Sequence, residues 1–175
     1  MSERFMIVEC FGDSVFSQQM KYEAAKVHTG IGDVVNRMMK YYSNRFALGV
    51  IDFDKGIRPG TLKNECSEIL NETQKHGLIL LKHNKRPHYF LVVVTEFEDW
   101  IDAATVEKNI IRSKFKLPDD LKKFKDLVKR REIEDNNNFK NYLNAIIQTN
   151  CSRIAAFRKF VREAQDHHSK KKKKT

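Results

Sequence analysis

The segment at residues 46–54, FALGVIDFD, joins an apolar run to two acidic residues. The run from Phe46 to Ile51 predicts a buried strand. Asp52 and Asp54 follow this strand two positions apart, so in an extended chain both side chains point to the same side. Ligands of open α/β sheets bind at the carboxyl ends of the strands. The segment therefore predicts both a buried sheet and a candidate site at its edge.

The flanking sequence predicts strands that alternate with helices. Apolar runs at residues 5–10, 78–81 and 89–94 predict three further strands. The last two are separated by a basic turn centred on Asn84 and Pro87, which indicates an antiparallel hairpin at one edge of the sheet. The alternation predicts an α/β fold with a mostly parallel sheet and helices on both faces.

Three helices are expected between these strands. The first begins at a cap formed by Asp13 or Ser14 and runs to about Lys26. The other two are recognised by their apolar spacing. The second carries Val34, Val35, Met38, Met39 and Tyr42 on one face, and the third carries Leu62, Cys66, Ile69 and Leu70.

The apolar spacing becomes helical after about Asn109, as in residues 121–128. We expect an α/β domain over residues 1–109, followed by a helical extension over residues 110–165 that packs on the sheet or on a partner. Residues 166–175 are expected to form a flexible basic tail.

The chain is basic, with a formal net charge of +10. Lys170 to Lys174 supply five of these charges, so the rest of the chain carries +5. A positive surface favours DNA or RNA through counterion release. The terminal lysine run is interpreted equally well as a nucleic-acid arm, a basic targeting signal or an artificial tail. A second basic face, at residues 122–131, is by default a solvated helix surface, but beside an acidic metal site it could guide a phosphate backbone.

The cysteines and the hydropathy pattern indicate the cellular environment. Cys10, Cys66 and Cys151 lie far apart, which argues against a disulfide framework or a zinc knuckle and for a reducing cytoplasm. The sequence has no apolar stretch long enough to span a bilayer and no signal-peptide pattern. We therefore expect a soluble, cytoplasmic protein that does not act on a membrane.

Further carboxylates fall at the ends of other predicted strands. Glu9 ends the first strand, and Glu96 and Glu98 follow the last one. Clustered carboxylates repel one another, and two or three of them, with waters and a substrate phosphate, suit Mg²⁺. The alternative for such residues is a helix cap or a solvated loop. Four cations are candidates for offsetting the charge that develops on the phosphate, namely Lys55, Lys82, Lys85 and Arg86.

Several short motifs occur in a particular order along residues 5–100. They are Met6-Ile7-Val8-Glu9 with Gly12-Asp13, then Gly30-Ile31-Gly32, then Ile51-Asp52-Phe53-Asp54. This ordered set resembles the Toprim domain, a Rossmann-like domain of topoisomerases, primases and several nucleases. The later Glu98-Asp99-Trp100-Ile101 is similar to compact stand-alone Toprim-like proteins, some of them associated with phage defence. Cys10-Phe11 departs from the pattern, because glycine often follows the glutamate directly.

The resemblance implies a role for each matching residue. Glu9 would be a metal ligand or a general acid/base. Asp52 and Asp54 would be Mg²⁺ ligands, with Mn²⁺ as an alternative ion, and Glu98 would be a further ligand. The backbone would approach the phosphate closely at two glycines, Gly30 and Gly32.

The chain is short for a topoisomerase or a primase, so the resemblance implies a Mg²⁺-dependent nuclease that acts on DNA or RNA. Two alternatives stay open. One is a catalytically silent Toprim-like module that binds nucleic acid or a partner ATPase, and the other is an RNA-processing enzyme on the same scaffold. The apolar stripes of the C-terminal helices suit a partner ATPase or a homo-oligomer.

Overall fold

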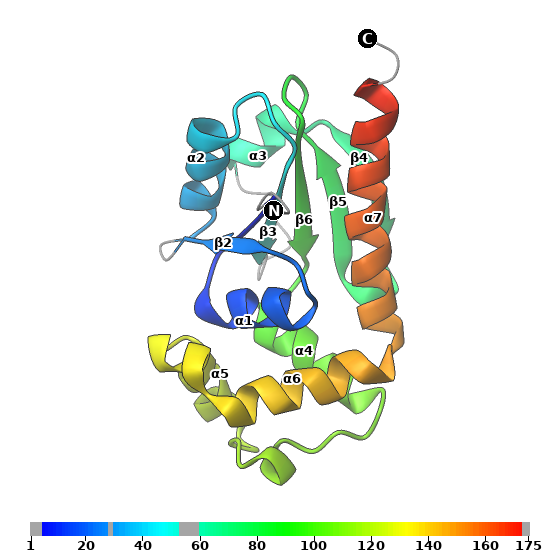
Figure 1. The fold of residues 1–175 in the computed structure, drawn as a ribbon. Helices are drawn as coiled ribbons and strands as arrows, with labels where there is room; N and C mark the ends of the chain where they lie inside the picture. Colours follow the sequence, from blue (N-terminus) through cyan, green and yellow to red (C-terminus); the bar gives the residue numbers. More distant parts are fainter. Residues whose placement is uncertain (1–4, 28–29, 53–59, 173–175) are drawn as a thin grey trace.

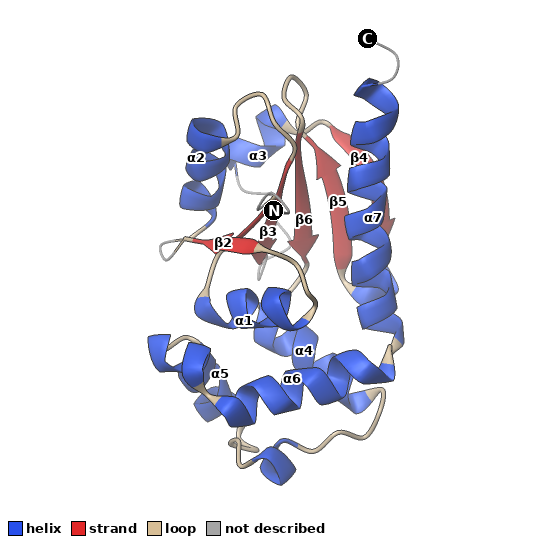
Figure 2. Cartoon of the chain, in the orientation of Figure 1, coloured by secondary structure: helices blue, strands red, loops and turns tan. Residues whose placement is uncertain are grey.

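The computed structural model describes residues 5–27, 30–52 and 60–172. They form a six-stranded mixed sheet in the order β2-β1-β3-β6-β5-β4 (Figure 1). The strands are β1 (Met6–Val8), β2 (Ala24–Lys26), β3 (Ala47–Asp52), β4 (Glu68–Thr73), β5 (Leu78–Lys82) and β6 (His88–Val93). The helices are α1 (Phe11–Gln19), α2 (Ile31–Tyr41), α3 (Gly60–Glu65), α4 (Phe97–Val106), α5 (Leu121–Val128), α6 (Asn137–Thr149) and α7 (Ser152–Lys172) (Figure 2). Short 3₁₀ helices lie at η1 (Gln74–His76), η2 (Arg112–Phe115) and η3 (Arg131–Asp135).

The strand directions confirm an α/β architecture with a mostly parallel sheet. β2, β1, β3 and β6 run parallel, whereas β5 runs antiparallel to both of its neighbours, β6 and β4. This arrangement is compatible with a Rossmann-like fold. The predicted hairpin is present as β5 and β6, but it does not lie at an edge, because β4 pairs with β5 and forms the outer strand.

The prediction of the third helix is wrong for the second half of that segment. Leu62 lies on α3, but Ile69 and Leu70 lie on β4. The helix ends before Ser67, whose backbone N–H and hydroxyl both donate to Asn84 Oδ1, at 3.0 and 2.7 Å. These bonds hold the chain beside the β5–β6 turn, from which it continues as an extended strand.

The predicted first helix has a different cap and a different end. Cys10, and not Asp13 or Ser14, is the N-cap. Cys10 Sγ accepts a hydrogen bond from the Asp13 N–H at 3.5 Å, and Asp13 Oδ2 accepts one from the Cys10 N–H at 3.1 Å, which makes a capping box. α1 ends well before Lys26, since Lys21 has a φ of +64°, a conformation that a helix cannot continue.

The two faces of the sheet pack against different sets of helices. Met6 and Val8 of β1 belong to one core and Ile7 to the other, as the pleat of a strand requires. The core around Ile7 includes Val34 and Met38 of α2. Helices therefore cover both faces, as the sequence predicts.

The C-terminal helices complete the core around Met6. α7 lies along β5 and β6 (Figure 1), and His167 Nδ1 is 2.9 Å from the hydroxyl of Tyr89. α7 continues to Lys172, through residues that the sequence assigns to a flexible tail. The aromatic side chains that α5, α6 and α7 contribute to this core include Phe124, Phe139 and Phe157. Among the described helices, none is long and apolar enough to cross a membrane.

Candidate functional site

The carboxyl ends of β1, β3 and β6 meet at one end of the sheet, because these strands are parallel neighbours. Glu9 follows β1, Asp52 ends β3, and Glu96 and Glu98 follow β6. All four line one pocket with a volume of about 360 Å³. The strand order reverses between β1 and β3, which is where α/β sheets bind ligands. The structure thus brings the predicted Glu9, Asp52 and Glu98 together.

Asp52 connects two sides of this pocket. Its backbone N–H donates to Glu9 Oε2 at 3.4 Å, and its Oδ2 accepts from the N–H of Phe97 at 3.0 Å. Phe97 is the first residue of α4, so Asp52 caps that helix. In the described part of the chain, the other oxygen, Oδ1, is buried without a hydrogen-bond partner. Such an oxygen is costly unless a proton or a cation satisfies it.

Three acidic groups in this region are unusually hard to ionise. Burial raises the pKa of Asp52 well above its usual range, and the charges of Asp13 and Glu9 raise it further. Burial raises the pKa of Asp13 to about 7, and it also raises the pKa of Glu98. Asp13 and Glu98 are each 2% exposed, and within the described residues Asp13 Oδ1 and Glu98 Oε2 lack partners. The cluster therefore favours a bound proton or cation over full ionisation.

Three helices begin at the same pocket. A helix N-terminus carries unpaired N–H groups and a partial positive charge, which favour anions such as phosphate. The pocket thus combines carboxylates, which attract cations, with helix ends, which attract anions. The lining residues at these starts are Cys10 and Phe11 for α1, Gly30 and Ile31 for α2, and Glu96 and Glu98 for α4.

The two predicted phosphate-approach glycines differ in position. Gly30 has a φ of +103°, a conformation that other residues rarely adopt, and it lines the pocket. A Cβ at Gly30 would lie 3.7 Å from Glu9 Oε1. A Cβ at Gly32 would meet nothing within 4 Å in the described part of the chain, and Gly32 is not among the lining residues of the pocket. The structure therefore places Gly30, but not Gly32, at the candidate site.

Lys125 of α5 and Lys129, the C-cap of this helix, lie beside the acidic residues of the pocket. Lys125 Nζ lies 3.0 Å from Glu96 Oε2 and 2.7 Å from Asp99 Oδ1, and its hydrogen bond lowers the pKa of Glu96. Lys129 lines the pocket, with its Nζ 3.7 Å from Glu96 Oε2 and its side chain 55% exposed. The basic face at residues 122–131 thus lies beside the acidic pocket.

Three of the four predicted cations do not lie at this site, and the fourth is not described. Asp54 and Lys55 lie outside the described residues, so their roles stay predictions. Lys82, Lys85 and Arg86 lie at the opposite end of the sheet, because β5 is antiparallel to β6 and Lys82 pairs with the amino end of β6. The prediction that these three residues offset charge at the acidic pocket is therefore wrong.

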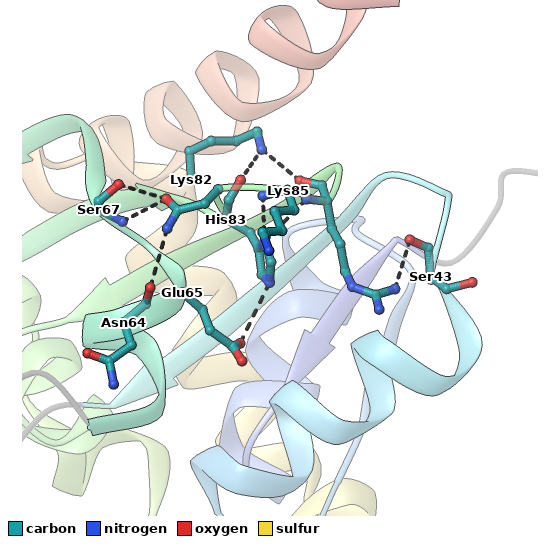
Figure 3. A network of polar contacts seen from close by, with 9 residues as sticks. Ser43, Asn64, Glu65, Ser67, Lys82, His83 and Lys85 are labelled. Atoms are coloured by element: carbon teal, nitrogen blue, oxygen red, sulfur yellow. Dashed lines mark hydrogen bonds and ion pairs between the residues drawn. The ribbon is translucent and has the colours of Figure 1, made fainter.

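Figure 3 shows that these residues instead hold the β5–β6 turn together. Lys82 is 5% exposed, and its Nζ donates to the carbonyls of His83 and Arg86. His83 Nδ1 accepts from the N–H groups of Lys85 and Arg86, at 3.1 and 3.2 Å. The Arg86 guanidinium donates to the carbonyl of Ser43 at 3.3 Å. Lys82 and Arg86 thus donate to backbone carbonyls, and these contacts give the turn a structural role.

The acidic pocket fits an open metal site better than a closed one. Among the residues that the structure describes, no group of three or more His, Cys, Asp or Glu is placed to hold an ion. Glu9 and Asp52 are nevertheless adjacent, and Asp52 carries the unsatisfied buried oxygen. Mg²⁺ is commonly held by one or two carboxylates, with waters and substrate phosphates as its other ligands. The residues present suit that kind of site.

Sequence reasoning missed part of the site. Asp13 is predicted as a helix cap and quoted in the motif set, but it is given no role at the site. Its position about one helical turn after Glu9 is a signal that both carboxylates lie at one end of the sheet. The position of Lys129 depends on how α5 packs, and no local pattern indicates it. No protein-family model, curated protein or solved structure was found to match this chain.

Proposed function

We propose that this chain is a Mg²⁺-dependent nuclease with a Toprim-like catalytic domain, which hydrolyses phosphodiester bonds in DNA or RNA. The observation that carries the proposal is that four carboxylates and three helix N-termini line one pocket. The order of the elements also agrees with the Toprim pattern. An acidic residue follows β1, a glycine precedes α2, and an acidic residue ends β3.

The two kinds of group in the pocket suggest what it binds. Carboxylates alone repel a phosphate, and helix N-termini alone repel a cation. A phosphate that is bound through a divalent cation needs both kinds of group, because the carboxylates hold the ion and the helix ends stabilise the phosphate oxygens. A phosphodiester with Mg²⁺ is therefore the ligand whose charges match the pocket.

Each described residue of the pocket would have a separate role in catalysis. Glu9 and Asp52 would hold the ion, and Asp52 is well fixed for this role because its other oxygen caps α4. Bound Mg²⁺ would polarise the phosphate and lower the pKa of an attacking water. Glu98 would act as the proton donor or acceptor, since burial raises its pKa above the usual value of a glutamate. Gly30 would keep the start of α2 close to the phosphate.

The test compares Mg²⁺-dependent cleavage of DNA and RNA by the wild type and by Asp52→Asn and Glu9→Gln. Asparagine at position 52 keeps an oxygen that can accept the Phe97 N–H, so the cap of α4 is retained. We expect cleavage to fall by at least about 100-fold in each variant. Glu132→Gln, an exposed carboxylate on η3, is the matched control. Full activity in both variants, with folding verified by circular dichroism, would rule out this mechanism.

A catalytically silent Toprim-like module that binds nucleic acid or a partner ATPase is the second candidate. It is favoured by the absence of a preformed three-residue metal group among the described residues. Calorimetric titration with Mg²⁺ and Mn²⁺ distinguishes the two candidates. The nuclease binds the ion, and Asp52→Asn weakens that binding. The silent module binds no ion, and Asp52→Asn leaves its affinity for nucleic acid unchanged.

A further inference from the structure

We propose that Lys129 binds a phosphate of the nucleic-acid chain at the mouth of the acidic pocket. The inference rests on the proposed function, because it takes the ligand to be a nucleic acid. It assigns to α5, which lies in the C-terminal helical region, a direct part in substrate binding.

The first observation is the charge of the pocket lining. Among the described residues that line it, four carry carboxyl groups, namely Glu9, Asp52, Glu96 and Glu98, and one, Lys129, carries an ammonium. A polyanion that approaches these carboxylates meets repulsion, and within the described lining Lys129 is the side chain that opposes it. Its ammonium is the group best placed to attract a phosphate before or during ion binding.

The second observation is that the two lysines beside Glu96 are held differently. Lys125 lies within 3.0 Å of both Glu96 and Asp99, and its side chain is 23% exposed. Lys129 lies 3.7 Å from Glu96, which is longer than a good hydrogen bond, and it is 55% exposed. Lys125 therefore neutralises Glu96, whereas Lys129 can exchange that weak ion pair for a phosphate without leaving a buried charge behind.

The third observation is that the contact between Val128 and Gly12 fixes the backbone next to Lys129. Val128, the preceding residue, is fully buried against Gly12 of α1. A Cβ at Gly12 would lie 2.3 Å from Val128 Cγ1, so the two helices approach as closely as glycine allows. Gly12 lies in the first turn of α1, directly after the pocket residues Cys10 and Phe11. This packing therefore holds the backbone of Lys129 beside the acidic pocket.

The test measures binding of a short fluorescent DNA duplex to the full-length protein by anisotropy, with Ca²⁺ in place of Mg²⁺. The salt concentration is varied between about 50 and 200 mM, and gels verify that the DNA stays intact. We expect Lys129→Ala to weaken binding about five- to tenfold near 0.1 M salt and to reduce the salt slope by about 1, the effect of losing one phosphate contact. Lys129→Arg should restore both quantities. Lys122→Ala, an exposed lysine of α5 that does not line the pocket, should change affinity less than about twofold.

Each result bears on a different claim. If Lys129→Ala keeps the wild-type affinity and salt slope while the wild type cleaves DNA, this inference fails and the nuclease proposal stands. An equal effect of Lys122→Ala would show a diffuse basic surface and would also overturn it. If binding depends on Lys129 but no DNA or RNA is cleaved, this inference is supported and the nuclease proposal is rejected. Wild-type protein that binds neither DNA nor RNA would overturn both.

Discussion

Replacing Asp13 by asparagine is expected to stabilise the protein, and to do so more at pH 8 than at pH 5. The Asp13 side chain is 2% exposed, and burial, with further contributions from Glu98 and Glu9, raises its pKa from 3.8 to about 7. Asparagine has nearly the same shape, and its side-chain oxygen can still accept the Cys10 N–H that Asp13 accepts at 3.1 Å. The substitution therefore removes the titration and keeps the capping bond.

The magnitude follows from the difference in pKa between the two states. Each tenfold change in an ionisation constant corresponds to about 1.4 kcal/mol, so ionised Asp13 costs the folded state about 4 kcal/mol. Between pH 3.8 and pH 7 the folded state binds more protons than the unfolded state, so stability falls as the pH rises through this window. Part of the cost is already present at pH 5. We expect the advantage of Asp13→Asn to grow by about 2–3 kcal/mol between pH 5 and pH 8.

The assay is urea unfolding in the presence of EDTA, followed by the fluorescence of Trp100. This residue is the only tryptophan of the chain, and it is 2% exposed, so it reports the loss of the core. Asp126→Asn, which removes an exposed carboxylate on α5, is the matched control. A stability difference between Asp13→Asn and the wild type that is the same at both pH values would refute the reasoning.

Four further outcomes are expected. Gly12→Ala should lower the free energy of unfolding by about 1–3 kcal/mol, despite the better helix propensity of alanine, because its Cβ collides with Val128; wild-type stability in urea would contradict this contact. Gly30→Ala should cost about 1–3 kcal/mol in thermal unfolding, since alanine is strained at a φ of +103°. Lys82→Ala should lower the free energy of unfolding by about 1–3 kcal/mol, because two turn carbonyls lose their hydrogen-bond donor. Mg²⁺-dependent cleavage should not change, because the turn lies at the opposite end of the sheet from the pocket. A folded but inactive variant would contradict this. Mg²⁺ at 100 times its Kd should stabilise the wild type by about 2.7 kcal/mol at pH 8, and Asp52→Asn should lose this gain in calorimetry.

The parts of the fold that the sequence predicts are those fixed by local pattern and by strand direction. Apolar runs predict β1, β3, β5 and β6, whereas β2 and β4 lie in segments for which the sequence predicts helix. Parallel neighbouring strands end on the same side of the sheet, so Glu9 and Asp52 could be expected to meet. The same rule explains the failure at Lys82. β5 is antiparallel to β6, so the turn that joins them lies at the amino end of β6. It therefore cannot lie near the carboxyl ends of β1, β3 and β6.

The missed features depend on small displacements or on packing between distant segments. The start of α1 lies only a few residues from its predicted position, yet this shift moves Asp13 from the predicted N-cap to the third residue of the helix, where its carboxylate is buried. Lys129 reaches the pocket through the contact of Val128 with Gly12, more than a hundred residues apart in the chain. Helical spacing indicates which face of α5 is apolar, but not which helix it meets.

The packing of α7 along β5 and β6 has a consequence for synthesis on the ribosome. Because α7 is synthesised after all six strands, apolar side chains of this core such as Tyr89, which contacts His167, remain exposed to water until residues 152–172 have emerged. During this interval, chaperones that bind exposed apolar segments can bind the nascent chain. A recombinant fragment that stops at residue 109 would keep Glu9 and Asp52 but leave this face bare, so it should precipitate.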